Sequence, residues 1–329
     1  MNYYKKLILL LSGSLLLAIQ GCKPVVIDNN IKPSENFNFV FNLYQGGDRM
    51  DSFIIDSVKP YLRDGDILVV VSGNGIEDGA DLSKAAHNVT NANYRTVNVA
   101  EVNTRLATLK AALADIDIHY VVYTAGIGHI QEILAGLNEA SKAQLAGITS
   151  GYEPNYLLEF TYNGQDFKYI QDAAKLIRDA GYEAGLGPSG RGLSSNQFIG
   201  WNYGQFAQRL DEMIVQTQSH LAKDARDRNL NVTNYKNVAL NPLLSQMSQF
   251  PGNCRVYPQV TIGLGIEENT AEESNTNAAA LAYCIQGVKA IYAAGFPGAS
   301  LWFGYNAMDN MLELVKTIRT ELEADKQGD

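Results

Sequence analysis

The chain has 329 residues, of which 46% are hydrophobic, and a formal net charge of −9 at pH 7. Because binding to phosphate needs clustered lysine and arginine, this acidic balance excludes nucleic acid as a partner. The length allows one large hydrophobic core or two small ones, and composition alone leaves that choice open.

The N-terminus has the layout of an export signal. Lys5 and Lys6 precede an apolar run, residues 7–19, that is too short to span a bilayer comfortably. A short charged segment followed by such a run is typical of a signal peptide. We therefore expect residues 1–21 to be removed on export.

The run leads into Ile19-Gln20-Gly21-Cys22. This tetrapeptide resembles the lipobox of bacterial lipoproteins. The resemblance implies cleavage before Cys22, acyl chains on that cysteine and anchoring in the cell envelope through lipid alone. Several acyl chains together anchor a protein stably, whereas a single chain binds the membrane only marginally. An ordinary secreted protein with a chance cysteine is the alternative.

The segment after the cysteine is polar and contains Pro24 and Pro33. It cannot bury enough apolar surface to fold, so residues 22–36 are expected to form a lipidated, flexible tether. Residues 37–329 are expected to form the folded domain, outside the cytoplasm. Lys23, rather than aspartate, follows the cysteine, which is compatible with delivery to an outer membrane.

Short apolar runs then alternate with segments whose apolar residues recur at helical spacing. Strands are predicted over residues 37–44, 67–72, 119–124, 146–151, 182–187, 212–218, 256–264 and 299–304. Helices are predicted over residues 52–63, 101–114, 129–143, 166–180, 203–209, 241–250, 275–294 and 309–324. Eight strand–helix units indicate an α/β fold, a single (β/α)8 TIM-like barrel, with a doubly wound open sheet as the alternative.

The sequence offers no signature of a metal or cofactor site. The four histidines are scattered, and neither a Cys-x-x-Cys nor a phosphate-binding loop occurs. We therefore expect no metal and no cofactor. Cys254 and Cys284 could form a disulfide in an exported protein or remain two free thiols.

In such a barrel the residues that follow each strand converge on one face, where function lies. Here they include amides and aromatic rings, which suit a sugar because rings stack on its C–H faces and amides bond its hydroxyls. Gln216 and Gln218 are two residues apart, so both point the same way, and we expect that way to be the mouth of the barrel. The predicted carbohydrate-contacting residues are Tyr44, Asn74, Tyr152, Asn155, Arg191, Gln216, Gln218, Trp302 and Tyr305.

After the fourth predicted strand, Gly151-Tyr152-Glu153-Pro154-Asn155 is similar to the Asn-Glu-Pro motif of the retaining glycoside hydrolases with (β/α)8 barrels. The resemblance implies that Glu153 is the general acid/base. It also implies a nucleophilic glutamate after the seventh strand, a place that Glu267 or Glu268 fills, and a tryptophan from the eighth strand on the floor of the sugar site, as Trp302 could supply. Tyr152 departs from the family's asparagine, and Glu267 and Glu268 lie in a polar run that could be a solvated loop.

Three functions remain open from the sequence. The first is a glycoside hydrolase that faces the periplasm or the cell surface and cleaves a polysaccharide or oligosaccharide with two carboxyl groups about 5 Å apart. The second is a glycan-binding lipoprotein whose degenerate barrel has lost catalysis, which the departure at Tyr152 favours. The third is a scaffold for envelope or exopolysaccharide assembly, which would need an exposed apolar patch.

Overall fold

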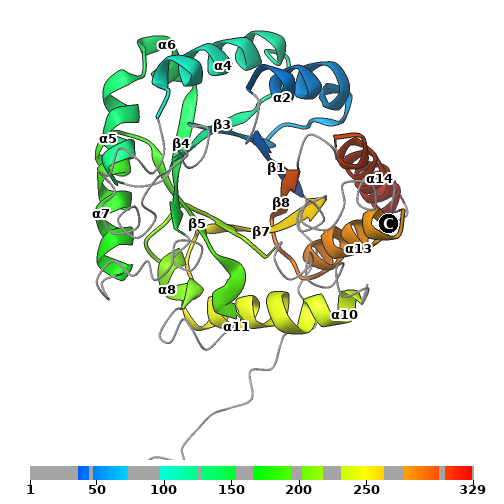
Figure 1. The fold of residues 1–329 in the computed structure, drawn as a ribbon. Coiled ribbons are helices and arrows are strands. Elements are labelled where there is room, and N and C mark those ends of the chain that lie inside the picture. Colours follow the sequence, from blue (N-terminus) through cyan, green and yellow to red (C-terminus); the bar gives the residue numbers. More distant parts are fainter. Residues whose placement is uncertain are drawn as a thin grey trace, which may run out of the picture. The chain divides into compact units, whose positions relative to one another are not determined.

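Eight parallel strands close into a barrel, in the order in which they occur along the chain (Figure 1). The computed structural model describes residues 36–43, 47–72, 97–124, 127–152, 166–193, 202–217, 231–262, 278–303 and 308–327. Pairing of Phe39 with Ala299 joins the first strand to the last, which excludes an open sheet. The strands are β1 (Asn38–Leu43), β2 (Ile67–Val71), β3 (His119–Thr124), β4 (Leu145–Tyr152), β5 (Glu183–Pro188), β6 (Glu212–Val215), β7 (Arg255–Ile262) and β8 (Gly298–Phe303).

Helices form a ring outside the strands (Figure 1). The fold is therefore the single (β/α)8 barrel that the alternating pattern predicts. The α-helices are α2 (Gly47–Phe53), α4 (Val99–Ala112), α5 (Ile127–Gly136), α6 (Glu139–Gln144), α7 (Asp166–Asp179), α8 (Tyr203–Ala207), α10 (Val232–Tyr235), α11 (Asn241–Gln249), α13 (Ala278–Ala293) and α14 (Met308–Gln327). The shorter turns are the π-helical η1 (Ile54–Val58) and η5 (Lys236–Leu240) and the 3₁₀-helical η2 (Lys59–Tyr61) and η3 (Gly190–Leu193).

Asparagine caps decide where several helices begin. The side chain of Asn98 accepts a hydrogen bond from the backbone N–H of Glu101 at the start of α4, and Asn202 caps α8 in the same way. Asn138 accepts from Ser141 and starts α6. One helix over residues 129–143 was predicted, and this was wrong, because Asn138 leaves the helical path to cap a second, separate helix.

The outward faces of the strands pack under the helices and form the main core. On β2 every residue is buried, as its continuous apolar run predicts for a strand covered on both faces. The inner core is smaller. It consists of Val40, Ile67, Val69, Val121, Ile214 and Tyr257.

The strand registers arrange the inward-facing positions in layers to which alternate strands contribute. The first layer is entirely polar, the third is the most apolar, and polar side chains recur in the layers toward the C-terminal end. From the N-terminal end the layers are Asn38, His119, Glu183 and Arg255; Ile67, Gly147, Glu212 and Gly298; Val40, Val121, Gly185 and Tyr257; Val69, Thr149, Ile214 and Ser300; Asn42, Tyr123, Gly187 and Gln259; and Val71, Gly151, Gln216 and Trp302.

Cys254 and Cys284 are free thiols. The Cys284 thiol donates to the carbonyl oxygen of Thr261 at 3.0 Å, near the C-terminal end of β7, whereas Cys254 precedes the other end of that strand. Seven residues of strand separate the two places by about 23 Å, far beyond the reach of a disulfide. Of the two alternatives for this pair, the structure therefore supports free thiols.

Within the described residues, no helix is both long enough and apolar enough to cross a bilayer. Cys22, the predicted signal peptide and all of the predicted tether except Asn36 lie outside those residues.

Candidate functional site

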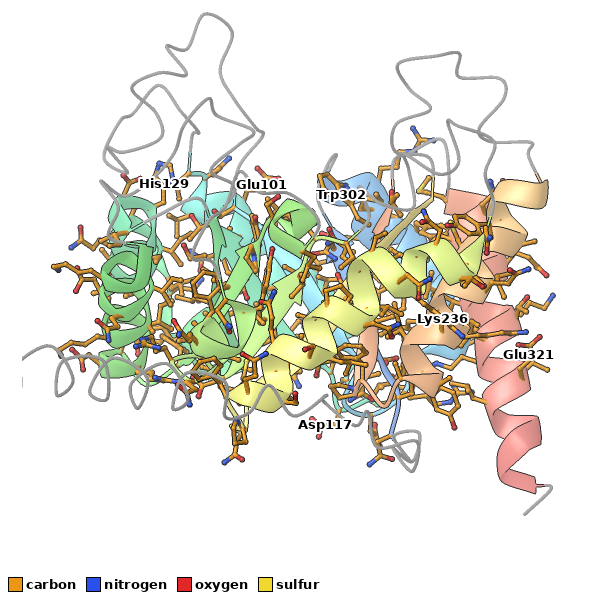
Figure 2. The ribbon with its side chains drawn as sticks, turned by 90° about the horizontal axis from the view of Figure 1, so that it is seen from below. Glu101, Asp117, His129, Lys236, Trp302 and Glu321 are labelled. Carbon is orange, nitrogen blue, oxygen red and sulfur yellow. The ribbon has the colours of Figure 1, made fainter. Side chains whose placement is uncertain are left out.

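The candidate site is the mouth of the barrel at the C-terminal ends of the strands. Figure 2 shows Trp302 at the same end of the barrel as Glu101 and His129, with Asp117 at the opposite end. Asp117 precedes β3 and Trp302 lies near the end of β8, so the labelled tryptophan marks the end where barrels of this fold carry their function.

Below the mouth, side chains from β1, β7 and β8 form a hydrogen-bonded group. Asn42 donates from Nδ2 to Ser300 Oγ at 2.7 Å and to the backbone oxygen of Leu301 at 3.0 Å. Gln259 donates from Nε2 to the same Ser300 Oγ at 3.2 Å. All three side chains are buried. We call Asn42, Tyr123, Gln259 and Ser300 the mouth floor.

Tyr123 supplies the aromatic part of the mouth floor. Its ring lies against β4 and β5 at two glycines. A Cβ on Gly151 would lie 2.4 Å from Tyr123 Oη, and one on Gly187 would lie 2.8 Å from Tyr123 Cε2. Real Cβ atoms do not approach so closely, so the glycines provide the space that the ring occupies.

Gln216 and Trp302 lie in the layer above. Gln216 is inward-facing and only 9% exposed, and its Nε2 donates to the backbone oxygen of Gly187 at 3.2 Å. Trp302 is half-buried and pairs in register with Thr261 of β7. An amide and an indole at the rim are groups that suit a sugar ring, and ligand contact by these two residues stays a prediction.

Three inward-facing polar atoms near the mouth lack a hydrogen-bond partner within the part of the chain that the structure describes: Thr149 Oγ1, Gln259 Oε1 and Thr261 Oγ1. Buried polar atoms are normally satisfied, and those that are not call for an explanation such as a ligand or a bound water.

Most of the predicted site residues lie outside the described residues, so their placement stays a prediction. Tyr152 ends β4 and Arg191 lies in η3, but the structure describes only their backbone. The remaining ones outside the described residues are Tyr44, Asn74, Glu153, Asn155, Gln218, Glu267, Glu268 and Tyr305.

No residue of the mouth floor is among the predicted site residues. Those predictions centre on the segments that follow the strands, whereas Asn42, Gln259 and Ser300 lie within the strands themselves. The signal was available, because each is a polar residue near the C-terminal end of an otherwise apolar strand. Their inward direction follows only from the register with neighbouring strands.

The carboxyl groups that the structure describes inside the barrel lie at its other end. Glu183 accepts from Arg255 Nη1 at 3.3 Å and from Nη2 at 2.5 Å, and its Oε2 lies 2.9 Å from His119 Nε2. Glu212 Oε2 lies 3.5 Å from Arg255 Nη2. We call His119, Glu183, Glu212 and Arg255 the basal ion cluster.

The two carboxyl groups of the basal ion cluster have opposite electrostatics. The hydrogen bond from His119, together with Arg255, lowers the pKa of Glu183 to about 2. Burial raises the pKa of Glu212, which is 2% exposed. These residues occupy the N-terminal layers, at the end of the barrel opposite the mouth. Their position therefore indicates a role in stabilising the closed barrel and not in chemistry at the mouth.

Among the residues that the structure describes, no cluster of His, Cys, Asp and Glu side chains could hold a metal ion. The described mouth therefore offers amides, hydroxyls and aromatic rings as its binding groups.

No family model and no curated protein sequence matches the chain. Among solved structures, a GH5_18 protein from Streptomyces cattleya in complex with GlcNAc is similar at a TM-score of 0.51 and 12% identity, over 88% of this chain and 82% of that one. The PgaB (BpsB) glycoside hydrolase domain from Bordetella bronchiseptica is similar at a TM-score of 0.49 and 8% identity, over 86% and 98%.

A phospho-2-dehydro-3-deoxyheptonate aldolase from Thermotoga maritima is similar at a TM-score of 0.42 and 9% identity, over 88% of this chain and 70% of that one. At such identities the likeness shows the fold alone. The class that fold and site define is a (β/α)8 barrel with a polar, aromatic mouth, and this fold hosts many unrelated functions.

Proposed function

We propose that this chain is a lipid-anchored glycoside hydrolase of the bacterial cell envelope, which cleaves a polysaccharide or oligosaccharide at the mouth of its barrel. The observation that carries the proposal is the mouth floor, where buried amides and a tyrosine ring lie beneath Trp302. Rings that stack on sugar faces and amides that bond hydroxyls are what a glycan site requires.

The position of Glu153 supports a catalytic reading. It directly follows Tyr152, the last residue of β4, and the strands of this fold present their ends to the mouth. In the proposed mechanism Glu153 protonates the leaving oxygen, while Glu267 or Glu268 attacks the anomeric carbon and forms a glycosyl-enzyme. Glu153 then takes a proton from the water that cleaves this intermediate.

A second candidate, a glycan-binding protein without catalysis, is favoured by one observation on β7. The inward positions near the end of this strand hold Gln259 and Thr261, and neither side chain can act as a carboxylate nucleophile. Cleavage therefore depends on a glutamate beyond Ile262, the last described residue of that segment.

The experiment is a screen of the purified chain against soluble bacterial and plant polysaccharides that follows both binding and release of reducing ends. Glu153→Gln is expected to lower release by about 100- to 10,000-fold, because a general acid contributes a factor of this size. Glu139→Gln is the matched control, since Glu139 is exposed on α6, and it should leave release unchanged.

Retained release in Glu153→Gln would remove this residue from the mechanism. Binding without release by the parent chain would favour the second candidate. Retention of the anomeric configuration in the product, followed by NMR, would support the two-carboxylate mechanism, and inversion would contradict it.

A further inference from the structure

Two unpartnered polar atoms lie one above the other on the inward face of β7. Gln259 Oε1 and Thr261 Oγ1 belong to side chains that are each 4% exposed, and neither atom has a hydrogen-bond partner among the described residues. Residues two apart on a strand point the same way, so both face the mouth end of the barrel. Burial without a partner costs free energy, and a hydroxyl group in the mouth that bonds these two atoms would offset that cost.

The surrounding bonds fix the direction of the Gln259 amide. Its Nε2 donates to Ser300 Oγ, which also accepts from Asn42 Nδ2. The nitrogen side of the amide is thereby held against β8, and the acceptor, Oε1, is the side that remains unused.

Thr261 lies beside an aromatic residue of the neighbouring strand. It pairs in register with Trp302 of β8, as Gln259 pairs with Ser300 one step deeper. The backbone carbonyl oxygens of both β7 residues already accept hydrogen bonds from side chains. The backbone oxygen of Gln259 accepts from Thr217 Oγ1 at 2.7 Å, and that of Thr261 accepts from the Cys284 thiol. The side chains are therefore held on a fixed strand, with their free atoms in one row.

We infer that Gln259 and Thr261 form a specificity row that binds the hydroxyls of an uncharged sugar unit, an inference that rests on the proposed function of the mouth. The side-chain oxygen of Gln259, Oε1, accepts a hydrogen bond from one sugar hydroxyl, and the Thr261 hydroxyl bonds a second. Trp302 stacks its ring on the sugar face. An amide oxygen attracts a hydroxyl and repels a carboxylate or phosphate oxygen. The row therefore selects neutral sugars over acidic or phosphorylated ones.

The test compares ligand affinity with thermal stability in matched variants of the full chain. The probes are hexasaccharides of β-1,4-glucose, β-1,3-glucose, β-1,4-mannose and β-1,4-N-acetylglucosamine, together with an oligogalacturonate of the same length, and binding is followed by calorimetry. Thr261→Val removes the unused hydroxyl at constant shape. It should weaken binding of the neutral probe by about five- to tenfold and leave the melting temperature unchanged or raised.

Thr124→Val is the matched control. Thr124 Oγ1 is also buried and without a partner among the described residues, but the alternation along β3 turns it outward, toward the helices. Its replacement should leave affinity unchanged. Gln259→Met, which keeps the length of the side chain, should weaken binding by about tenfold or more with little change in melting temperature.

Four outcomes would overturn the inference. If the parent chain binds a neutral probe and both variants, Thr261→Val and Gln259→Met, bind it equally well, the proposed function stands and the specificity row is wrong. A lower melting temperature with unchanged affinity assigns both residues a structural role. Tighter binding of the oligogalacturonate than of every neutral probe contradicts the selection for uncharged sugars. A parent chain that binds none of the probes overturns the proposed function and the row together.

Discussion

The two glycines beneath the Tyr123 ring show how single residues shape the mouth. Gly151→Ala would put a Cβ 2.4 Å from Tyr123 Oη, so the ring or the strand must move. We expect this substitution to lower the free energy of unfolding by about 1–3 kcal/mol, as overpacking usually does. Urea unfolding measures the change.

Two further variants test that explanation. Gly252→Ala is the control, because its nearest neighbour, the Cα of Gln208, lies 4.0 Å from the added carbon. The double variant Gly151→Ala/Tyr123→Ala should be less destabilised than the sum of the two single variants, since it removes the clashing ring. Additive effects would mean that the ring is not what Gly151 accommodates.

At the same scale, one guanidinium neutralises the buried carboxylate of Asp66, which also accepts hydrogen bonds from the backbone N–H groups of Phe39 and Arg63. Arg319 of α14 donates from Nη2 to both oxygens of Asp66, at 2.6 and 2.7 Å, and from Nη1 to the backbone oxygen of Phe37 at 2.8 Å. Burial raises the pKa of Asp66, and Arg319 opposes that rise.

Arg319→Met should therefore lower the free energy of unfolding by about 3–5 kcal/mol, because it leaves a buried charge without its partner. Lys289→Met is the comparison, since Lys289 pairs with Glu321 at the surface and should contribute about 0–1 kcal/mol. Equal effects of the two substitutions in urea unfolding would mean that burial does not distinguish the pairs.

At the scale of elements, hydrophobic periodicity predicted each of the eight strands, and their residue ranges differ from the structure by only a few residues. β2 was the clearest, because a strand buried on both faces is apolar without interruption. Helix ends were harder, since a cap such as Asn138 acts through backbone geometry that periodicity does not report.

Two features of the structure could not be predicted from the hydrophobic pattern of the sequence. The chain after α2 continues as π-helical and 3₁₀ turns to Tyr61, where a helix over residues 52–63 was predicted. The mouth floor and the basal ion cluster join residues more than 40 positions apart, such as His119 and Arg255, and only the closed register brings these together.

At the scale of the whole molecule, the basal ion cluster predicts a stability that changes with pH in two windows. The pKa of Glu183 is about 2 in the fold against an ordinary 4.5, so its stabilisation is complete above pH 4.5 and is lost as the pH falls toward 2. The pKa of Glu212 is raised above the ordinary 4.5, so the fold gains stability as the pH falls from that raised value to 4.5.

Urea unfolding from about pH 2 to about pH 8 checks both windows. The variant Glu183→Gln should flatten the acid-side loss, and Glu212→Gln should flatten the gain on the other side. Parallel curves for the parent and both variants would mean that the cluster does not control the pH dependence.

The anchoring of the molecule is tested separately. If Cys22 carries the lipid, Cys22→Ala should move the exported protein from the membrane fraction to the soluble one, because the acyl chains supply the binding. Fractionation and immunoblotting follow the change, with Cys254→Ala as the control that should stay with the membrane. Unchanged retention of the Cys22 variant would contradict the lipoprotein proposal.

Closure of the barrel between its first and last strands has a consequence for the timing of folding. β1 gains its second neighbour only when β8 has been made, and the Arg319 guanidinium, 4.6 Å from the centre of the Phe39 ring, arrives later still. Until synthesis is nearly complete, β1 has one open edge and an uncovered apolar face, and contacts between such distant segments form slowly. A nascent chain of this barrel therefore cannot close its first strand against its last until β8 and α14 have been synthesised.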